Sequence, residues 1–302
     1  MKRRTGIKGF IVPAGAALLV VGLGVGGWEA LGGRESDRRA SGEPELGTVA
    51  APVVGKPDDV ATWRLPLEAY TPAVADMKKV GAARDVLIDA CMAAAGYPDW
   101  TPAPDLPQID GVSPMDSRYG IHKAELASRR GYHPDEALQK EYDAAVSVGA
   151  VDSSGADQKV LVKCAGDVDG KAPQLKKSAA ASQVDADSFR QSLKDPAVLE
   201  VFSRWSSCMK AKGFNYATPK DAREDPRFID KNVVTDLEKK TAVADVACRK
   251  EHGLEKVWFD AETRLQQQAI KKDQLTFESL KKTNQTSVEK SSSVLSGVES
   301  GR

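Results

Sequence analysis

Four cysteines, Cys91, Cys164, Cys208 and Cys248, are the residues of this 302-residue chain with the most distinctive chemistry. Cysteines form disulfides in oxidising compartments, bind soft metal ions as thiolates, or act as redox pairs. A redox pair or a zinc site usually shows the spacing Cys-x-x-Cys, which the sequence lacks. In an exported chain the four cysteines therefore imply two disulfides with three possible pairings, whereas a cytosolic chain would keep four free thiols.

Two further patterns resemble metal sites, and both are incomplete. Cys248 and His252 are four residues apart and share a helix face, as zinc ligands can, but the other two histidines have no comparable partner. Asp167-Val-Asp-Gly170 resembles part of a calcium loop, but Lys176 stands where the bidentate glutamate is expected. No P-loop, metalloprotease or serine-hydrolase motif occurs beyond the glycine-rich N-terminal segment. The sequence therefore predicts a non-enzymatic protein with no cofactor and no metal ion.

An internal repeat contains two of the cysteines. The segment 91–102 (CMAAAGYPDWTP) recurs at 208–219 (CMKAKGFNYATP), with six of twelve positions identical and no gap. This pattern is typical of a helix end, at which a glycine takes the left-handed cap position and the next aromatic residue folds back. We therefore expect helix C-caps at Gly96, Gly213 and Gly253, the last of which follows the fourth cysteine with the same spacing but without Thr-Pro.

The repeat also selects a disulfide pairing. Each Cys-Met element is followed by one later cysteine. We therefore predict the pairs Cys91–Cys164 and Cys208–Cys248, one within each repeat. On the chain-entropy account each would stabilise the fold by roughly 4 kcal/mol.

The elements that must position these residues are predicted to be helices. Apolar residues recur at intervals of three and four along 74–94, 196–212 and 255–282, and no alternating strand pattern or Asn-Gly hairpin is present. The predicted fold class is all-α, with two divergent disulfide-linked helical repeats and a long C-terminal helix behind an N-terminal transmembrane or signal helix. The predicted divisions are a membrane anchor or signal over 1–32, a flexible tether over 33–64, a first repeat over 65–170, a connector over 171–185, a second repeat with the C-terminal helix over 186–282, and a disordered tail over 283–302.

The N-terminal segment has the length of a membrane span. Residues 9–28 carry no charge, and twenty helical residues extend over about 30 Å, the thickness of the hydrocarbon core. Four basic residues precede this segment, which favours a cytoplasmic N-terminus and an extracytoplasmic bulk. The alternatives are a signal peptide cleaved near Ala30-Leu-Gly32, which would leave a secreted protein, and a cytosolic protein.

The balance of charge excludes an overall polycationic nucleic-acid binder. Lys and Arg number 43 and Asp and Glu number 43, so the formal net charge is zero. This neutrality is a cancellation, because residues 1–40 carry net +4, residues 41–170 net −9 and residues 171–302 net +5. An acidic first repeat and a basic second one predict attraction between the repeats or different partners for each.

Several segments resemble those of exported, often membrane-anchored actinomycete proteins with repeated Cys-Met-x3-Gly-Tyr/Phe elements. The matching stretches include 65–70 (LPLEAY), the two Cys-Met elements, 118–121 (RYGI) and 243–248 (VADVAC). The resemblance covers about residues 65–282 and implies an all-helical fold with paired cysteines. It supplies no catalytic residues, and the lipid-bearing cysteine of some members is missing here, which leaves the N-terminal helix as the anchor.

These features predict a non-enzymatic, single-pass membrane protein that acts through protein or cell-wall contacts at the bacterial envelope. The alternative is an exported ligand-binding or sensor module with a pocket between the repeats. Arg118-Tyr119 and Arg129-Arg130, near Tyr132, are candidates for contacts with an anion or with peptidoglycan, and a solvated helix face explains them equally well.

Overall fold

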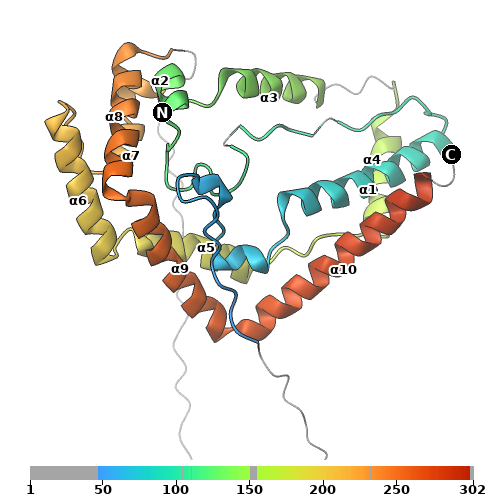
Figure 1. The fold of residues 1–302 in the computed structure, drawn as a ribbon. Coiled ribbons are helices and arrows are strands. Elements are labelled where there is room, and N and C mark those ends of the chain that lie inside the picture. Colours follow the sequence, from blue (N-terminus) through green and yellow to red (C-terminus); the bar gives the residue numbers. More distant parts are fainter. Residues whose placement is uncertain (1–46, 104, 110, 150–154, 231–232, 300–302) are drawn as a thin grey trace, which may run out of the picture. The chain divides into compact units, whose positions relative to one another are not determined.

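The computed structural model describes residues 47–299, apart from 104, 110, 150–154 and 231–232 (Figure 1). All the helices given below belong to one compact unit, residues 46–302. The anchor or signal predicted over 1–32 lies outside the described residues. Among the helices that are described, none combines the length and the apolar character that crossing a membrane requires.

The described part of the chain is all-α, as predicted. It contains ten α-helices and three short 3-10 helices. The described residues form no β-strand, and their one β-type contact is an isolated bridge between Val53 and Arg64. The helices are η1 (Val60–Thr62), η2 (Pro66–Ala69), α1 (Val74–Ala94), α2 (Ala124–Arg130), α3 (Glu136–Gly149), α4 (Gln158–Asp169), α5 (Ala179–Ser192), α6 (Pro196–Ala211), α7 (Pro219–Arg223), η3 (Pro226–Phe228), α8 (Asp236–His252), α9 (Leu254–Lys272) and α10 (Gln274–Glu299).

One group of helices packs around the first disulfide. α1 lies along α10 and also contacts α4, to which the Cys91–Cys164 disulfide joins it with a Cα–Cα distance of 5.7 Å (Figure 1). Met92, Trp100 and Val168 form the apolar cluster beside this disulfide. The α1–α4 pair is therefore held by a cross-link together with a small core.

The larger core surrounds α6, α8 and α9. α6 contacts both of the other helices, α5 packs on α9, and α2 packs on α8. Trp205 and Phe259 have no exposed surface in this core, and Trp258 stacks on Phe189 with ring centroids 5.4 Å apart. The Cys208–Cys248 disulfide joins α6 to α8 here. Both disulfides are thus the pairs expected from the sequence.

α1 and α6 end in the same backbone arrangement. The N–H of Tyr97 donates to the carbonyl of Met92 at 2.9 Å, and the N–H of Phe214 donates to that of Met209 at 2.9 Å. Such a bond closes a Schellman cap, in which the glycine before the donor takes a positive φ that other residues avoid. The φ angles of the three expected cap glycines are 96° at Gly96, 88° at Gly213 and 60° at Gly253.

The predicted tether is wrong over the residues that the structure describes. Val60 and Trp63 belong to the larger core, and Trp63 is only 2% exposed. The indole Nε1 of Trp63 donates to the carbonyl of Lys56 at 2.9 Å, and Val53 and Arg64 exchange two backbone hydrogen bonds. Residues 53–64 therefore form part of the folded unit, because Val60, Ala61 and Trp63 are buried in it.

The C-terminal predictions also need correction. The helix expected over 255–282 is two helices, because the chain breaks at Asp273, where φ is −136° and ψ is 44°. The tail expected to be disordered from residue 283 continues α10 as far as Glu299. Asn284 is almost fully buried, and its Oδ1 accepts a hydrogen bond from the N–H of Lys176 at 2.7 Å. Packing against the rest of the unit thus orders a segment whose composition suggested disorder.

The predicted repeats do not pack as separate bodies. α1 contacts α10, and α2 contacts α8, so helices from 65–170 pack on helices from the C-terminal half of the chain. The connector expected over 171–185 is also too long, because α5 begins at Ala179. Its N-cap is Ser178, whose hydroxyl accepts from the N–H of Ala181, an interaction that favours a helix start there.

Candidate functional site

A pocket of about 410 Å³ lies in the described part of the chain. Its walls come from the loop before α2, from α2 itself, from the start of α3, and from Arg223 at the end of α7. The lining is mostly apolar, and its apolar residues are Ile109, Val112, Ile121, Leu126, Pro134 and Leu138, with the ring of Tyr132. The pocket thus combines the 109–138 segment, which we call the pocket wall, with one residue from the second half of the chain.

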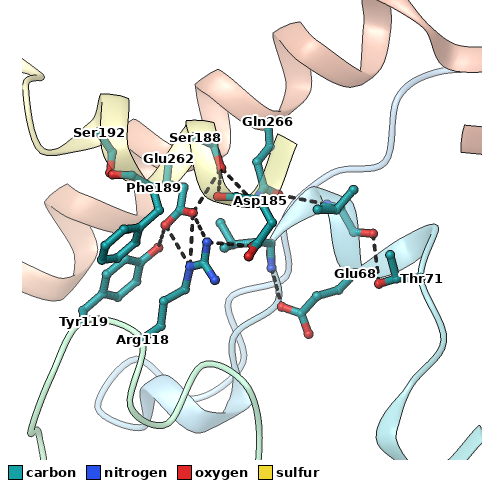
Figure 2. A network of polar contacts seen from close by, with 12 residues as sticks. Glu68, Thr71, Arg118, Tyr119, Asp185, Ser188, Phe189, Ser192, Glu262 and Gln266 are labelled. Carbon is teal, nitrogen blue, oxygen red and sulfur yellow. Dashed lines mark hydrogen bonds and ion pairs between the residues drawn. The ribbon is translucent and has the colours of Figure 1, made fainter. Parts of the chain in front are cut away.

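Glu262 on α9 fixes the first part of the pocket wall. Arg118 donates from Nε to both carboxylate oxygens, at 3.1 and 3.0 Å, and the Tyr119 hydroxyl donates to Oε2 at 2.8 Å (Figure 2). The Ser188 hydroxyl of α5 lies 3.2 Å from Oε1. Arg118 also donates to Asp185 at 2.9 Å. A carboxylate with no exposed surface is thereby satisfied from the pocket wall and from α5.

The electrostatic environment keeps Arg118 charged and the Tyr119 phenol protonated. Burial lowers the pKa of Arg118, but its hydrogen bond to Glu262 and the nearby carboxylates outweigh burial and raise it overall. Burial and the charge of Glu262 raise the pKa of the Tyr119 phenol, so Tyr119 stays a neutral donor. Arg118 is therefore a charged donor to Glu262, and Tyr119 is a neutral one.

Asp245 on α8 fixes the middle of the pocket wall from behind. Its Oδ1 accepts from the Trp205 indole at 2.8 Å and from Arg249 Nε at 2.6 Å, and its Oδ2 accepts from the Tyr132 hydroxyl at 3.2 Å. Arg249 then donates from Nη1 to the carbonyl of Tyr119 at 2.6 Å. This buried aspartate–arginine pair connects two points of the pocket wall with the larger core.

Glu238, in the first turn of α8, fixes the end of α2. Its Oε1 accepts from the N–H of Tyr132 at 2.9 Å and lies 3.5 Å from Nε2 of His133. Gly131 sits directly over this carboxylate with φ 60° and ψ −125°. A Cβ at Gly131 would lie 2.3 Å from Oε1, so the close approach requires glycine.

Asp116 organises the loop that closes the pocket before α2. Its Oδ2 accepts from the N–H of Val112 at 2.8 Å and from Lys123 Nζ at 2.7 Å, and its Oδ1 lies 3.2 Å from Nε2 of His122. The side chain is only 3% exposed. The loop is thus held by a buried carboxylate that also positions Lys123 on the pocket lining.

Both histidines of the pocket wall are nine-tenths buried. The side chains of His122 and His133 are each 10% exposed. Their Nε2 atoms lie beneath the surface near Asp116 and Glu238, but these contacts do not have hydrogen-bond geometry. Burial lowers the pKa of His122, and the charge of Asp116 opposes this shift without cancelling it. His122 is therefore neutral at pH 7 and contributes a polar but uncharged surface.

Three cationic side chains line the pocket, and two of them are paired. Lys123 contacts Asp116, and Arg129 contacts Asp135 at 3.2 Å. Arg223 is exposed and makes no hydrogen bond or ion pair with any residue that the structure describes. A ligand with an acidic group therefore has one guanidinium open to it.

The structure separates the basic residues that the sequence grouped as candidate contacts. Arg118 is mostly buried and bound to Glu262, so it is not available to a ligand. Arg129 lines the pocket, and Arg130 donates from Nε to the carbonyl of Pro134 at 3.2 Å. Of these residues, Arg129 and Tyr132 are the ones brought together at the pocket.

The other sequence candidates lie away from the pocket. The four cysteines form the two disulfides, and Gly96, Gly213 and Gly253 cap helices. The aspartates of the calcium-like stretch belong to α4, where Asp167 contacts Lys163 at 2.6 Å and Asp169 contacts Arg84 at 2.6 Å.

The three buried carboxylates behind the pocket wall, Glu238, Asp245 and Glu262, were not recognised from the sequence. The sequence feature that could have identified two of them is the position of acidic residues on the buried face of a helix. Glu238 and Asp245 are seven residues apart on α8 and lie among buried apolar positions. Such acids indicate buried partners rather than a solvated face.

Comparisons of the chain with protein-family models, with curated proteins and with solved structures find no match. The class of the molecule therefore rests on its own features, an all-α fold with two disulfides and a pocket walled by residues 109–138. The disulfides indicate an oxidising, extracytoplasmic environment.

Proposed function

We propose that this protein is a non-enzymatic binding protein of the bacterial envelope, anchored by its N-terminal segment, whose pocket takes a small ligand. The observation that carries the proposal is the pocket of about 410 Å³, whose wall is fastened by three buried carboxylates. Ligand pockets commonly have volumes of about 300–1,000 Å³ and mostly apolar linings with a few fixed polar groups. Because the buried carboxylates already fix the pocket wall, the wall loses little conformational entropy when a ligand binds.

The lining indicates an amphipathic ligand with an acidic end. Leu126, Tyr132 and Leu138 offer an apolar surface, and Arg223 offers an unpaired guanidinium at the rim. An acid–base catalyst must come within hydrogen-bond distance of a substrate proton. The Nε2 atoms of His122 and His133 lie beneath the pocket surface and do not have this access. This arrangement supports binding rather than catalysis.

A thermal-shift panel of muropeptide fragments, short peptides and small organic acids tests the proposal on the full chain. A ligand at one hundred times its Kd stabilises the folded state by about 2.7 kcal/mol, which raises Tm by several degrees in a domain of this size. Leu138→Trp fills the pocket and should abolish the shift, whereas Leu275→Trp, at an exposed position of α10, should keep it. A shift that Leu138→Trp leaves unchanged would refute the pocket as the site.

A second candidate is a contact with a protein or cell-wall partner through α3. None of the side chains described in this helix is buried, although Leu138 and Tyr142 lie four residues apart on one face and are partly covered. Cross-linking in intact cells from a photoreactive residue at Val146 tests it, since that side chain is exposed. Adducts with envelope components support the contact, and adducts with cytosolic proteins alone would contradict both the contact and the topology.

We also infer that α1 and α6 derive from a duplicated helix end. The support is that each carries a Cys-Met pair followed by a Schellman cap, and each is cross-linked to a later helix with a Cα–Cα distance of 5.7 Å.

A further inference from the structure

The last turn of α8 brings metal-binding groups next to the second disulfide. Sγ of Cys208, a carboxylate oxygen of Glu251 and a ring nitrogen of His252 all lie within 4.8 Å of one another. Cys208 Sγ is 3.5 Å from Glu251 Oε2, and His252 Nε2 is 3.9 Å from Glu251 Oε1. In the folded protein Cys208 is bonded to Cys248, and a disulfide sulfur lacks the thiolate charge that binds metal ions.

We propose that reduction of the Cys208–Cys248 disulfide converts this cluster into a zinc site with Cys208, Cys248, His252 and Glu251 as ligands. The co-reactant is a dithiol, which transfers two electrons and two protons to the disulfide, so that its own sulfurs become joined while the Cys208–Cys248 bond breaks. Zinc then replaces the two thiol protons, which pass to solvent, as it binds the thiolates. The site lies outside the pocket and does not depend on the proposed ligand.

The spacing of the four groups suits a tetrahedral zinc ion. Glu251 and His252 follow Cys248 by three and four residues on the same helix, so all three point to one side of α8. With zinc bonds of about 2.0–2.3 Å, ligand atoms of a tetrahedral site lie about 3.3–3.8 Å apart. The atoms of Cys208, Glu251 and His252 lie no more than 4.8 Å apart, so the longer separations must shorten by side-chain rotation. The two sulfurs must move apart once their bond is broken.

The cluster is also open to solvent and to a reductant. A shallow depression over it is lined by Ser203, Ser207, Cys208 and His252, with Arg204 at its side. The Arg204 guanidinium lies 3.8 Å from Glu200, so a carboxylate already offsets its charge. A dithiol can therefore approach Cys208, whereas Cys248 has no exposed surface and is the sulfur released on attack.

The first disulfide provides an internal comparison. Within the described residues, Cys208, Glu251 and His252 form the one group of three potential ligands that lie this close together, and Cys91–Cys164 belongs to none. Two thiolates with an imidazole and a carboxylate favour zinc over the hard cations calcium and magnesium. Zinc bound there would join α6 to α8 again after the disulfide is lost.

The test uses the full chain before and after reduction with a phosphine. Zinc is added to both samples, and unbound zinc is then removed by desalting. Metal analysis should find about one zinc per reduced chain and none on the oxidised chain. His252→Ala should weaken zinc binding at least about tenfold, and Cys91→Ser with Cys164→Ser should leave it unchanged. Cobalt in place of zinc should show tetrahedral, thiolate-type absorption that Cys208→Ser removes.

Circular dichroism distinguishes zinc bound at a site of the folded chain from zinc bound by cysteine thiols of an unfolded chain. The proposal expects the reduced, zinc-loaded chain to keep its helical signal and to melt at a higher temperature than the reduced chain without zinc. Absence of zinc from the reduced chain would overturn it, as would zinc that His252→Ala and Glu251→Gln both retain in full. Loss of the helical signal in the presence of zinc would overturn it as well.

Discussion

At the scale of single residues, the pocket wall is held by charges that are buried and paired. Glu262 has no exposed surface, and donors from Arg118, Tyr119 and Ser188 surround it (Figure 2). Removing one partner of a buried ion pair lowers the free energy of unfolding strongly, because the remaining charge is left buried without a counter-charge. This loss is much larger than the stability that the intact pair adds relative to apolar residues in its place. The buried carboxylates are thus strong determinants of where the pocket wall lies.

Glu262→Gln should lower the free energy of unfolding by about 3 kcal/mol, because Arg118 would be left without its main counter-charge. Urea denaturation followed by circular dichroism measures this difference. Glu289→Gln, at an exposed position of α10, is the control and should change stability by less than about 0.5 kcal/mol. Equal effects of the two substitutions would contradict the role given to Glu262.

Gly131→Ala should destabilise the protein by about 2 kcal/mol or more, because its backbone conformation is costly for other residues and a Cβ would strike Glu238. Gly166→Ala provides the matched control, since this glycine lies inside α4 with open space around its Cα. Alanine there should be neutral or stabilise by up to about 1 kcal/mol through helix propensity. Similar losses at both positions would show that the close approach to Glu238 is not needed.

The lowered pKa of His122 makes stability depend on pH in a defined direction. The folded pKa lies below the ordinary value of 6.5, mainly through burial; Asp116, Glu255 and Asp59 oppose this shift and Lys123 adds to it. The unfolded chain therefore binds more protons below about pH 6.5, and stability is lost as pH falls through that window toward the folded pKa. His122→Gln should flatten the slope of unfolding free energy between pH 7 and pH 5, and an unchanged slope would contradict this assignment.

At the scale of elements, the sequence predicts helices from their periodicity and helix ends from their cap residues. It does not predict features that depend on packing between distant segments. The Cys-Met-x3-Gly pattern located the ends of α1 and α6, because a left-handed glycine is a local requirement of the backbone. The burial of Gln266 depends on distant partners instead. Gln266 accepts from the N–H of Leu67 and donates to Ser188, and neither contact leaves a trace in local periodicity.

The pocket does not lie where the sequence placed one, between the repeats, because all of its lining residues except Arg223 come from 109–138, inside the first predicted repeat. Arg129 and Tyr132 were among the candidate contacts, whereas Asp116, Leu138 and Arg223 come from three other segments. Their meeting follows from the packing of α2 on α8, which the spacing within a single helix does not encode.

Removing residues 283–302 should destabilise the group of helices around the first disulfide. α10 extends to Glu299 and contacts α1, and Ser287 donates to the carbonyl of Gln174 at 2.7 Å. Hydrogen exchange should become faster in α1, whereas α6 should keep its protection because its partners are α8 and α9. Unchanged exchange in α1 would mean that the end of α10 adds nothing to the fold.

At the scale of the whole molecule, the two halves of the chain carry opposite charge and yet share their packing. Residues 41–170 carry net −9 and residues 171–302 net +5, and α1 and α2 of the first half contact α10 and α8 of the second. Raising the salt concentration should therefore lower the unfolding free energy modestly, because long-range attraction between exposed charges is screened. A stability that rises with salt would contradict attraction between the halves.

The proposed function requires that the pocket walled by residues 109–138 binds a ligand. Amide hydrogen exchange of the full chain, with and without the strongest stabilising compound of the panel, measures this binding at its site. Exchange should slow across 109–138 and at the end of α7, with no change in α10, and the compound should have no effect in Leu138→Trp. Protection elsewhere in the chain, or protection that survives Leu138→Trp, would contradict it.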